Sequence, residues 1–219
     1  MVYSPAMCCI STQLYLVALM IVLAAAMVSA AFALQGGRID AALFLAINGR
    51  YPPPALEWVV RLVSHFGLLP TNLAIWLAVW LGGHRSGTIA GARGIVGGLG
   101  LMGAWACCRL VKRVVRRQRP FVTLPGARLV GLEPNGSSFP SSHAALSVYT
   151  AVTLVHVLGW SGWRSAAAYA IALGVCYARI YLGAHYPRDV LGGALLGLTS
   201  ALATLVLAEI VVLWLSPWT

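Results

Sequence analysis

The side chains that could do chemistry gather in three short polar clusters of an otherwise apolar chain. Residues 112–120 read KRVVRRQRP, residues 139–143 read FPSSH, and residues 179–189 read RIYLGAHYPRD. Together these clusters offer fixed cations, two histidines, one carboxylate and a serine that precedes an apolar run. Cations and proton-transfer groups in this combination suit the binding and cleavage of a dianionic phosphate group.

The first cluster contains Lys112 and Arg119, which are seven residues apart. Seven residues make two helical turns, so a helix through residue 119 would project both side chains from nearly the same side. Pro120 is then expected to end that helix and to fix where the Arg119 guanidinium points, while Arg117 points elsewhere. A basic patch for anionic membrane lipids is the alternative interpretation of these residues.

The second cluster places Ser141 between a proline and an apolar helix, which is the position of an N-cap. A plain helix cap is the simpler interpretation. The same geometry, however, aims free backbone N–H groups and the positive end of the helix dipole at one point, where an anion could bind. His143, one turn inside the helix, could then donate a proton to a departing oxygen.

The third cluster places His185 four residues before Asp189. The carboxylate can reach one ring nitrogen if helical geometry extends back to His185, and it would then fix the tautomer and raise the basicity of the other nitrogen. Arg179 could supply a fork of donors for phosphate oxygens. An Arg–His–Asp group at the end of a membrane helix can also be structural.

The three clusters follow the patterns Lys-x6-Arg-Pro, Pro-Ser-x-His and Arg-x5-His-x3-Asp. Together, and in this order, these patterns resemble the signature of the type-2 phosphatidic acid phosphatase superfamily. The resemblance implies that His185 is a nucleophile that forms a phosphohistidine, that Asp189 orients and activates it, and that His143 protonates the leaving oxygen. It also implies a set of residues that hold the phosphate oxygens: Lys112, Arg119, Ser141, Ser142 and Arg179. No metal and no cofactor are required by this chemistry.

Two positions depart from the usual pattern of that family. The second motif normally has glycine where this chain has Ser142, and the third normally has serine where this chain has Ala178. Ser142 keeps its backbone N–H, whereas Ala178 removes one possible hydroxyl contact to phosphate. Neither change touches the nucleophile, its carboxylate or the acid, so an active enzyme is expected.

The composition indicates a membrane protein. The chain has 219 residues, of which 60% are hydrophobic and 9% charged, whereas about a quarter of residues are charged in an average soluble domain. The net charge of +10 would suggest nucleic acid in a soluble protein. Here the bases cluster at helix ends, so anionic lipid headgroups or a phosphate substrate explain them better.

Apolar runs of about 20 residues, the length that spans a bilayer, predict an all-α polytopic protein that forms a single domain over residues 1–219. The six expected spans are residues 14–34, 58–82, 88–111, 142–160, 165–182 and 187–215. Residues 14–34 lack a basic n-region and exceed a signal-peptide core, and residues 39–47 are expected to lie along the interface. With six spans, all three clusters fall at one membrane face, which predicts an active site there.

Two glycine pairs predict close approach between helices. Gly94 with Gly98, and Gly193 with Gly197, are small-xxx-small pairs of the kind that lets helix backbones meet. Such pairs serve packing within one chain or between copies, so they leave the oligomeric state open.

The predicted function is that of an integral membrane lipid phosphatase acting on a phosphomonoester or diphosphate lipid. The compact form resembles bacterial undecaprenyl diphosphate phosphatases, which makes undecaprenyl diphosphate, hydrolysed to undecaprenyl phosphate, the first expected substrate. Phosphatidylglycerophosphate, phosphatidic acid and lipid A 1-phosphate stay open, as does a lipid phosphotransferase with the same phosphohistidine. A transporter is disfavoured, because transport sites usually lie near the bilayer midplane.

The location of the site relative to the membrane follows from two opposing considerations. The positive-inside rule would place the face richer in Lys and Arg, which is the site face, in the cytoplasm. Bacterial relatives usually have the site on the periplasmic or outer face. Because bases at an anion site serve the chemistry, we expect a bacterial inner-membrane protein whose site faces the periplasm or the outside.

Overall fold

The computed structural model describes residues 37–49 and 54–215, in which every regular element is helical. In chain order the helices are α2 (Arg38–Asn48), α3 (Pro54–Ser64), η1 (His65–Gly67), α4 (Leu69–Ser86), α5 (Thr88–Val115), α6 (Pro120–Thr123), α7 (Ser142–Val157), α8 (Trp163–Tyr181) and α9 (Pro187–Leu215). The predicted first span, residues 14–34, lies outside the described residues.

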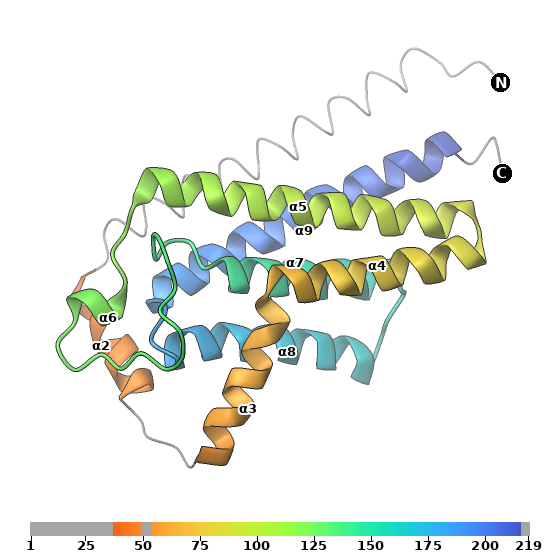
Figure 1. Cartoon of the computed structure of the whole chain (residues 1–219). Coiled ribbons are helices and arrows are strands. Elements are labelled where there is room, and N and C mark those ends of the chain that lie inside the picture. Colours follow the sequence, from red (N-terminus) through yellow and green to blue (C-terminus); the bar gives the residue numbers. More distant parts are fainter. Residues whose placement is uncertain (1–36, 50–53, 216–219) are drawn as a thin grey trace.

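The long helices run lengthwise in one bundle, whereas α2 and α6 lie at one end of it (Figure 1). Within the bundle α5 packs against α4 and α9, and α7 packs against α8 and α9. Helix α3 leaves the bundle at an angle and contacts α8. The ends of α5 and α8 and the starts of α7 and α9 therefore meet at the end where α2 lies.

The outer faces of the helices are apolar, as a lipid-facing surface requires. Leu77, Leu99, Leu173 and Leu202 are all more than half exposed, and so large an exposed apolar surface is unusual in a soluble monomer. Within the described residues, the segments Ile89–Thr123 and Pro187–Leu215 are long and apolar enough to cross a membrane, and α3 with α4 passes as a bent pair. The all-α membrane architecture is confirmed, and the number of six spans stays a prediction.

The predicted second span over residues 58–82 is not one continuous helix. It is divided into α3 and α4 by η1, and the two helices are bent by 60°. Pro70 lies in the first turn of α4, where its missing N–H costs no helical bond. A side chain at Gly67 would overlap Cβ of His143 and the Val175 side chain, so the break also brings this corner against the start of α7.

The predicted helix through Arg119 is wrong. Helix α5 ends at Val115, and Arg116 adopts the left-handed conformation with φ of 47°. Arg119 is extended (φ −84°, ψ 154°) and Pro120 begins α6, because a residue before proline is disfavoured in the helical region. Residues 116–119 therefore leave the helix axis and cross the end of the bundle.

The starts of α7 at Ser142 and of α9 at Pro187 agree with the prediction. Helix α2 matches the predicted amphipathic segment in length, and its place along the membrane interface stays a prediction. Its buried residues are Asp40, Phe44 and Asn48, which are spaced at one helical turn each, so one whole face packs onto the protein. This helix forms part of the site end of the bundle.

The glycine pairs serve contacts within the chain. A methyl group at Gly94 would meet the Trp80 backbone of α4. A methyl group at Gly193 or Gly197 would overlap backbone atoms of α7 at Ser141 and Ala145. Small residues at these positions let the helices approach closely enough for van der Waals contact along their backbones.

Buried hydroxyl groups join three of the helices in the bundle interior. The Tyr149 hydroxyl of α7 donates to the carbonyl of Gly97 in α5 at 2.8 Å and lies 3.2 Å from the Thr204 hydroxyl of α9. In a membrane such interhelical bonds add to packing, at about 0.6 kcal/mol each. They fix α7, whose first turn belongs to the site, between its two neighbours.

Replacing Gly197 with alanine is expected to lower the free energy of unfolding by about 1–3 kcal/mol, because the new methyl group would overlap the Ala145 carbonyl in a closely packed interior. The matched control is Gly103→Ala in α5, where nothing lies within 4 Å of the added carbon. That change should be neutral or stabilising by up to about 1 kcal/mol. Thermal unfolding in detergent measures both, and equal effects would contradict the packing role.

Candidate active site

The residues predicted from the three clusters come together at the end of the bundle where α2 lies (Figure 1). Lys112 lies in the last turn of α5, His143 in the first turn of α7, and Arg179 in the last turn of α8. His143 is within electrostatic range of four other members of the set: Arg179, His185, Lys112 and Arg119. The three clusters thus meet at one end of the bundle, and the location of that end at a membrane face stays a prediction.

Two of the cations are held by backbone carbonyls. Lys112 Nζ donates to the Ser137 carbonyl at 2.8 Å. Arg119 donates from Nη1 to the Ala184 carbonyl at 2.8 Å, and the same nitrogen lies 3.5 Å from Nε2 of His185. The two charges thus share a site because the segment after α5 folds back across it, and not because they share a helix face.

Arg179 is the third cation and is largely buried. Its Nη1 donates to the Ser64 hydroxyl at the end of α3, at 2.9 Å. Its Nε is buried and has no hydrogen-bond partner among the described residues. Because buried donors are nearly always paired, this nitrogen marks a position where an anion would complete the bonding.

Ser141 caps α7 as predicted. Its hydroxyl accepts a long bond of 3.5 Å from the Ala144 N–H, and its own N–H donates to the backbone carbonyl of Asp189 at 2.9 Å. The first backbone N–H groups of a helix lack intrahelical acceptors, and those of α7 include Ser142 and His143. The start of α7 can therefore bind anionic oxygens beside the cations.

His185 belongs to the short connection between α8 and α9, not to a helix. Its N–H donates to the Arg179 carbonyl at 3.2 Å, after a turn at Gly183, whose φ is +83°. Nδ1 lies 3.9 Å from Oδ2 of Asp189, too far for the hydrogen bond expected from helical spacing, because α9 begins only at Pro187. Nδ1 is buried and without a partner among the described residues.

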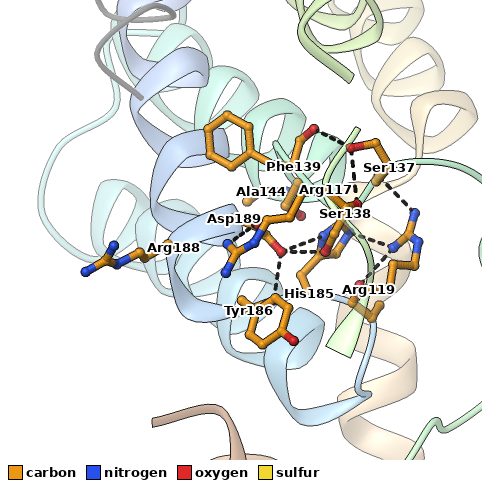
Figure 2. Close-up of polar contacts among 12 residues, drawn as sticks. Arg117, Arg119, Ser137, Ser138, Phe139, Ala144, His185, Tyr186, Arg188 and Asp189 are labelled. Carbon is orange, nitrogen blue, oxygen red and sulfur yellow. Dashed lines mark hydrogen bonds and ion pairs between the residues drawn. The ribbon is translucent and has the colours of Figure 1, made fainter. Parts of the chain in front are cut away.

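Asp189 is fully buried and accepts from three donors (Figure 2). Its Oδ2 accepts from the Ser138 hydroxyl and, at 2.9 Å, from the Tyr186 N–H. Its Oδ1 accepts from Nη1 of Arg117 at 2.7 Å. These three donors hold the carboxylate in one orientation.

Three residues of this network were not predicted from the sequence: Arg117, Ser138 and Asp40. Arg117 was expected to point elsewhere, but the end of α5 at Val115 turns it toward Asp189 and Asp40. Ser138 gave no signal beyond its place next to the second cluster. Asp40 is one of only five acidic residues in the chain, and a lone carboxylate on an amphipathic helix could have marked it.

Burial holds the pKa of His185 well below its ordinary value of 6.5, and the positive charges of Lys112, Arg179 and Arg119 lower it further. The ring is therefore neutral at neutral pH and has a free electron pair. Of its two nitrogens, Nε2 lies beside Arg119 and Nδ1 lies toward Asp189. Nε2 is thus the atom placed to attack an anion held by the cations.

Comparison with known proteins agrees with this geometry. A sequence model of the PAP2 superfamily matches residues 93–211. A decaprenylphosphoryl-5-phosphoribose phosphatase of Mycolicibacterium smegmatis is 32% identical over 68% of this chain and 75% of its own. An undecaprenyl-diphosphatase of Sulfolobus acidocaldarius is 37% identical over 39% of this chain and 41% of its own.

Among solved structures, the PAP2-type phosphatidylglycerolphosphate phosphatase of Bacillus subtilis superimposes with a TM-score of 0.67. It is 24% identical, and the match covers 91% of this chain and 96% of that one. The apolar helical bundle is that of an integral membrane protein. The chain belongs to the PAP2 superfamily and is a hydrolase of lipid phosphate esters.

The lowered pKa of His185 predicts that its imidazole stays neutral at pH 6.5 and takes up a proton only at lower pH. Imidazole ¹⁵N chemical shifts of the labelled protein measure this, with the signals assigned through His185→Gln. The direction of this pKa shift also affects stability. Below pH 6.5 the His185 side chain binds a proton in the unfolded chain but not in the folded protein, so the free energy of unfolding falls in acid. A titration midpoint at or above 6.5 would contradict the predicted environment.

Proposed function

We propose that this protein hydrolyses the terminal phosphate of a polyprenyl phospholipid through a phosphohistidine on His185, with undecaprenyl diphosphate as the first candidate. The observation that carries the proposal is the approach of Nε2 of His185 to Arg119, within electrostatic range of Lys112 and Arg179. A neutral nucleophile among fixed cations suits a phosphoryl group, whose charge spreads over its oxygens in the transition state.

In the first step, Nε2 of His185 attacks phosphorus and the bond from phosphorus to the lipid oxygen breaks. Lys112, Arg119, Arg179 and the N–H groups that begin α7 stabilise the phosphoryl oxygens. His143 takes up a proton as the anionic substrate binds beside it, and gives that proton to the departing lipid oxygen. Asp189 stabilises the positive imidazole once its 3.9 Å separation from Nδ1 closes into a hydrogen bond, since such bonds often tighten only with substrate bound.

In the second step, water attacks the phosphohistidine and releases inorganic phosphate. His143, now neutral, accepts the proton that the water loses, so the enzyme returns to its starting protonation. Neither step calls for a metal ion, because the cations of the chain occupy the role of electrostatic stabiliser.

An apolar cavity that begins one turn of α7 beyond His143 and extends away from the site suits the hydrocarbon tail. It has a volume of about 500 Å³ and lies between α4, α7 and α8. Ser147, Thr150 and Leu154 line it and continue the face of α7 on which His143 lies. A second cavity of about 550 Å³ shares Leu154 and Trp160 with the first. From Ser147 to Trp160 the two follow the bundle for roughly 20 Å at 1.5 Å per residue.

Decaprenylphosphoryl-5-phosphoribose is the second candidate substrate. The relative named for this activity aligns with the larger share of this chain, whereas the undecaprenyl-diphosphatase aligns with a shorter one. Both lipids combine a polyprenyl tail with a terminal phosphate, and the apolar cavity suits either tail. Phosphatidylglycerophosphate, phosphatidic acid, lipid A 1-phosphate and a lipid acceptor in place of water are weaker alternatives.

We also propose that residues 1–219 form one integral membrane domain of a bacterial inner membrane, with the site on the periplasmic or outer side. The three motifs and α2 belong to one end of the bundle (Figure 1), which favours a single catalytic unit. The basic residues at that end have roles in binding phosphate, so they carry less weight as signals of orientation.

Detergent-purified protein is expected to release phosphate from undecaprenyl diphosphate in the presence of EDTA, and His185→Ala should release none. The matched control is His156→Ala, at the far end of α7 near Glu209, which should retain full activity. Decaprenylphosphoryl-5-phosphoribose and the weaker alternatives are assayed in parallel to rank substrates. Release that survives His185→Ala would show that the nucleophile is another residue, and dependence on a metal would overturn the proposed chemistry.

Filling the tail cavity is expected to weaken lipid binding without harming the chemistry. Ala168→Phe places a ring in the cavity and should raise KM for undecaprenyl diphosphate at least about 10-fold, with little change for p-nitrophenyl phosphate. Ala166→Phe, on an exposed face of the same helix, is the control. Equal loss for the long and the short substrate would place the tail elsewhere.

A further inference from the structure

We propose that Arg117 and Asp40 are positioning residues that hold the catalytic carboxylate Asp189 ionised and correctly turned toward His185. This inference rests on the proposed phosphohistidine function, in which Asp189 orients the nucleophile. Arg117 occupies an unspecified position of the first motif, and Asp40 lies outside the segment that matches the family model.

The contacts of Arg117 define a clamp between two carboxylates. Nη1 donates to Oδ1 of Asp189 at 2.7 Å, and Nη2 forms an ion pair with Oδ2 of Asp40. The guanidinium lies over the ring of Tyr186, 4.2 Å from its centroid, where a cation is attracted by the ring face. Arginine suits this position because its planar fork carries several donors in fixed directions.

The charges explain why the clamp is needed. The side chains of Asp40 and Asp189 are about 1% and 0% exposed, and Arg117 forms an ion pair with each of them. Two neighbouring buried carboxylates disfavour each other's ionisation, and a buried charge without a partner is strongly destabilising. The guanidinium between them lets both remain charged.

Asp40 also fixes the start of α9. Its Oδ1 accepts from the Arg188 N–H at 3.1 Å, one residue before Asp189. Asp40 therefore holds both Arg117 and the first turn of the helix that carries Asp189. Through this residue α2, which packs on α8 and α9, becomes part of the catalytic apparatus.

Helix α2 has a second attachment that does not involve the clamp. Asn48 at its end donates to the carbonyls of Arg128 and Tyr181, both at 2.8 Å, and accepts from the Arg128 N–H at 2.7 Å. Phe44 packs against the Tyr186 ring, with centroids 5.7 Å apart. A change at Asp40 should thus leave α2 in place, and its effect can be assigned to the clamp.

The clamp acts through one oxygen of the catalytic carboxylate. Arg117 binds Oδ1, while Oδ2 accepts hydrogen bonds from Ser138 and Tyr186 and faces Nδ1 of His185. Without Arg117 the carboxylate is free to rotate and to bind a proton. The charged and titratable groups that face Asp189 are Arg117, Asp40 beyond it, His185, Lys112 and Arg119.

Arg117→Met is expected to lower kcat about 10–100-fold, as loss of a partner that orients a catalytic group does, with KM little changed. The acid limb of the pH–rate profile should move to higher pH, because a proton then competes for Asp189. Arg117→Lys should return the acid limb of the pH–rate profile to its wild-type position, because the positive charge is kept. It should recover only part of kcat, because a lysine lacks the two fixed donors of the guanidinium. Asp40→Asn should lower kcat less than Arg117→Met does.

The matched control is Arg128→Met. Arg128 also pairs with a carboxylate, Glu57, at 3.1 Å and lies over a tyrosine ring, that of Tyr181, at 4.9 Å. The two arginine side chains are similarly exposed, 15% for Arg117 and 20% for Arg128. Arg128→Met should lower the thermal midpoint to a similar extent and leave kcat and the acid limb unchanged.

A second measurement, which needs no turnover, separates failure of the clamp from failure of the proposed function. The imidazole ¹⁵N shifts of His185 should change in Arg117→Met and stay as in the wild type in Arg128→Met. If the wild-type protein releases no phosphate, the proposed function is wrong. The ¹⁵N shifts of His185 would still show whether Arg117 positions Asp189. Equal kcat, acid limb and shifts in Arg117→Met and Arg128→Met would overturn the inference.

Discussion

The burial of the Asp189 carboxylate is the constraint on which the site depends. A charge in the interior of a membrane bundle is stable only when donors surround it. Here the donors come from three separate segments: Arg117 after α5, Ser138 before α7 and the Tyr186 N–H before α9. The backbone carbonyl of Asp189 in turn accepts from Ser141. Satisfying this one residue therefore brings the starts of α7 and α9 and the segment after α5 into a fixed relation.

The cations obey a complementary constraint. Lys112, Arg119 and Arg179 repel one another in a region that water reaches poorly, and each is held by oxygen atoms of the chain: the carbonyls of Ser137 and Ala184, and the Ser64 hydroxyl. These oxygens stabilise the cations while no anion is bound, and they leave charge available for a phosphate group. The repulsion among the cations is thus offset largely by backbone carbonyls in the connections between helices. Such free carbonyls occur at helix ends, which is why the site lies there and not in the middle of the bundle.

Much of the site could be predicted from the sequence because its chemistry resides in residue types at fixed spacing. The starts of α7 and α9 follow from local rules for a capping serine and a first-turn proline, which hold in any context. The path of residues 116–119 could not be predicted, because a helix through Arg119 satisfies the periodicity equally well. Its actual course depends on the left-handed turn at Arg116 and on partners distant in sequence. Asp40 was missed for the same reason, since Arg117 lies 77 residues away from it.

The division between motif and non-motif residues has a physical basis. Residues that touch phosphate must have particular donors at particular points, so their types and spacing are narrowly set. Residues that hold those groups need only deliver charge and shape, and they can come from any segment that reaches the site, as α2 does through Asp40. Arg117 contacts carboxylates on both α2 and α9, and it also contacts the Tyr186 ring. The position of the proposed nucleophile, His185, therefore depends on α2, a helix that carries none of the residues proposed to bind phosphate.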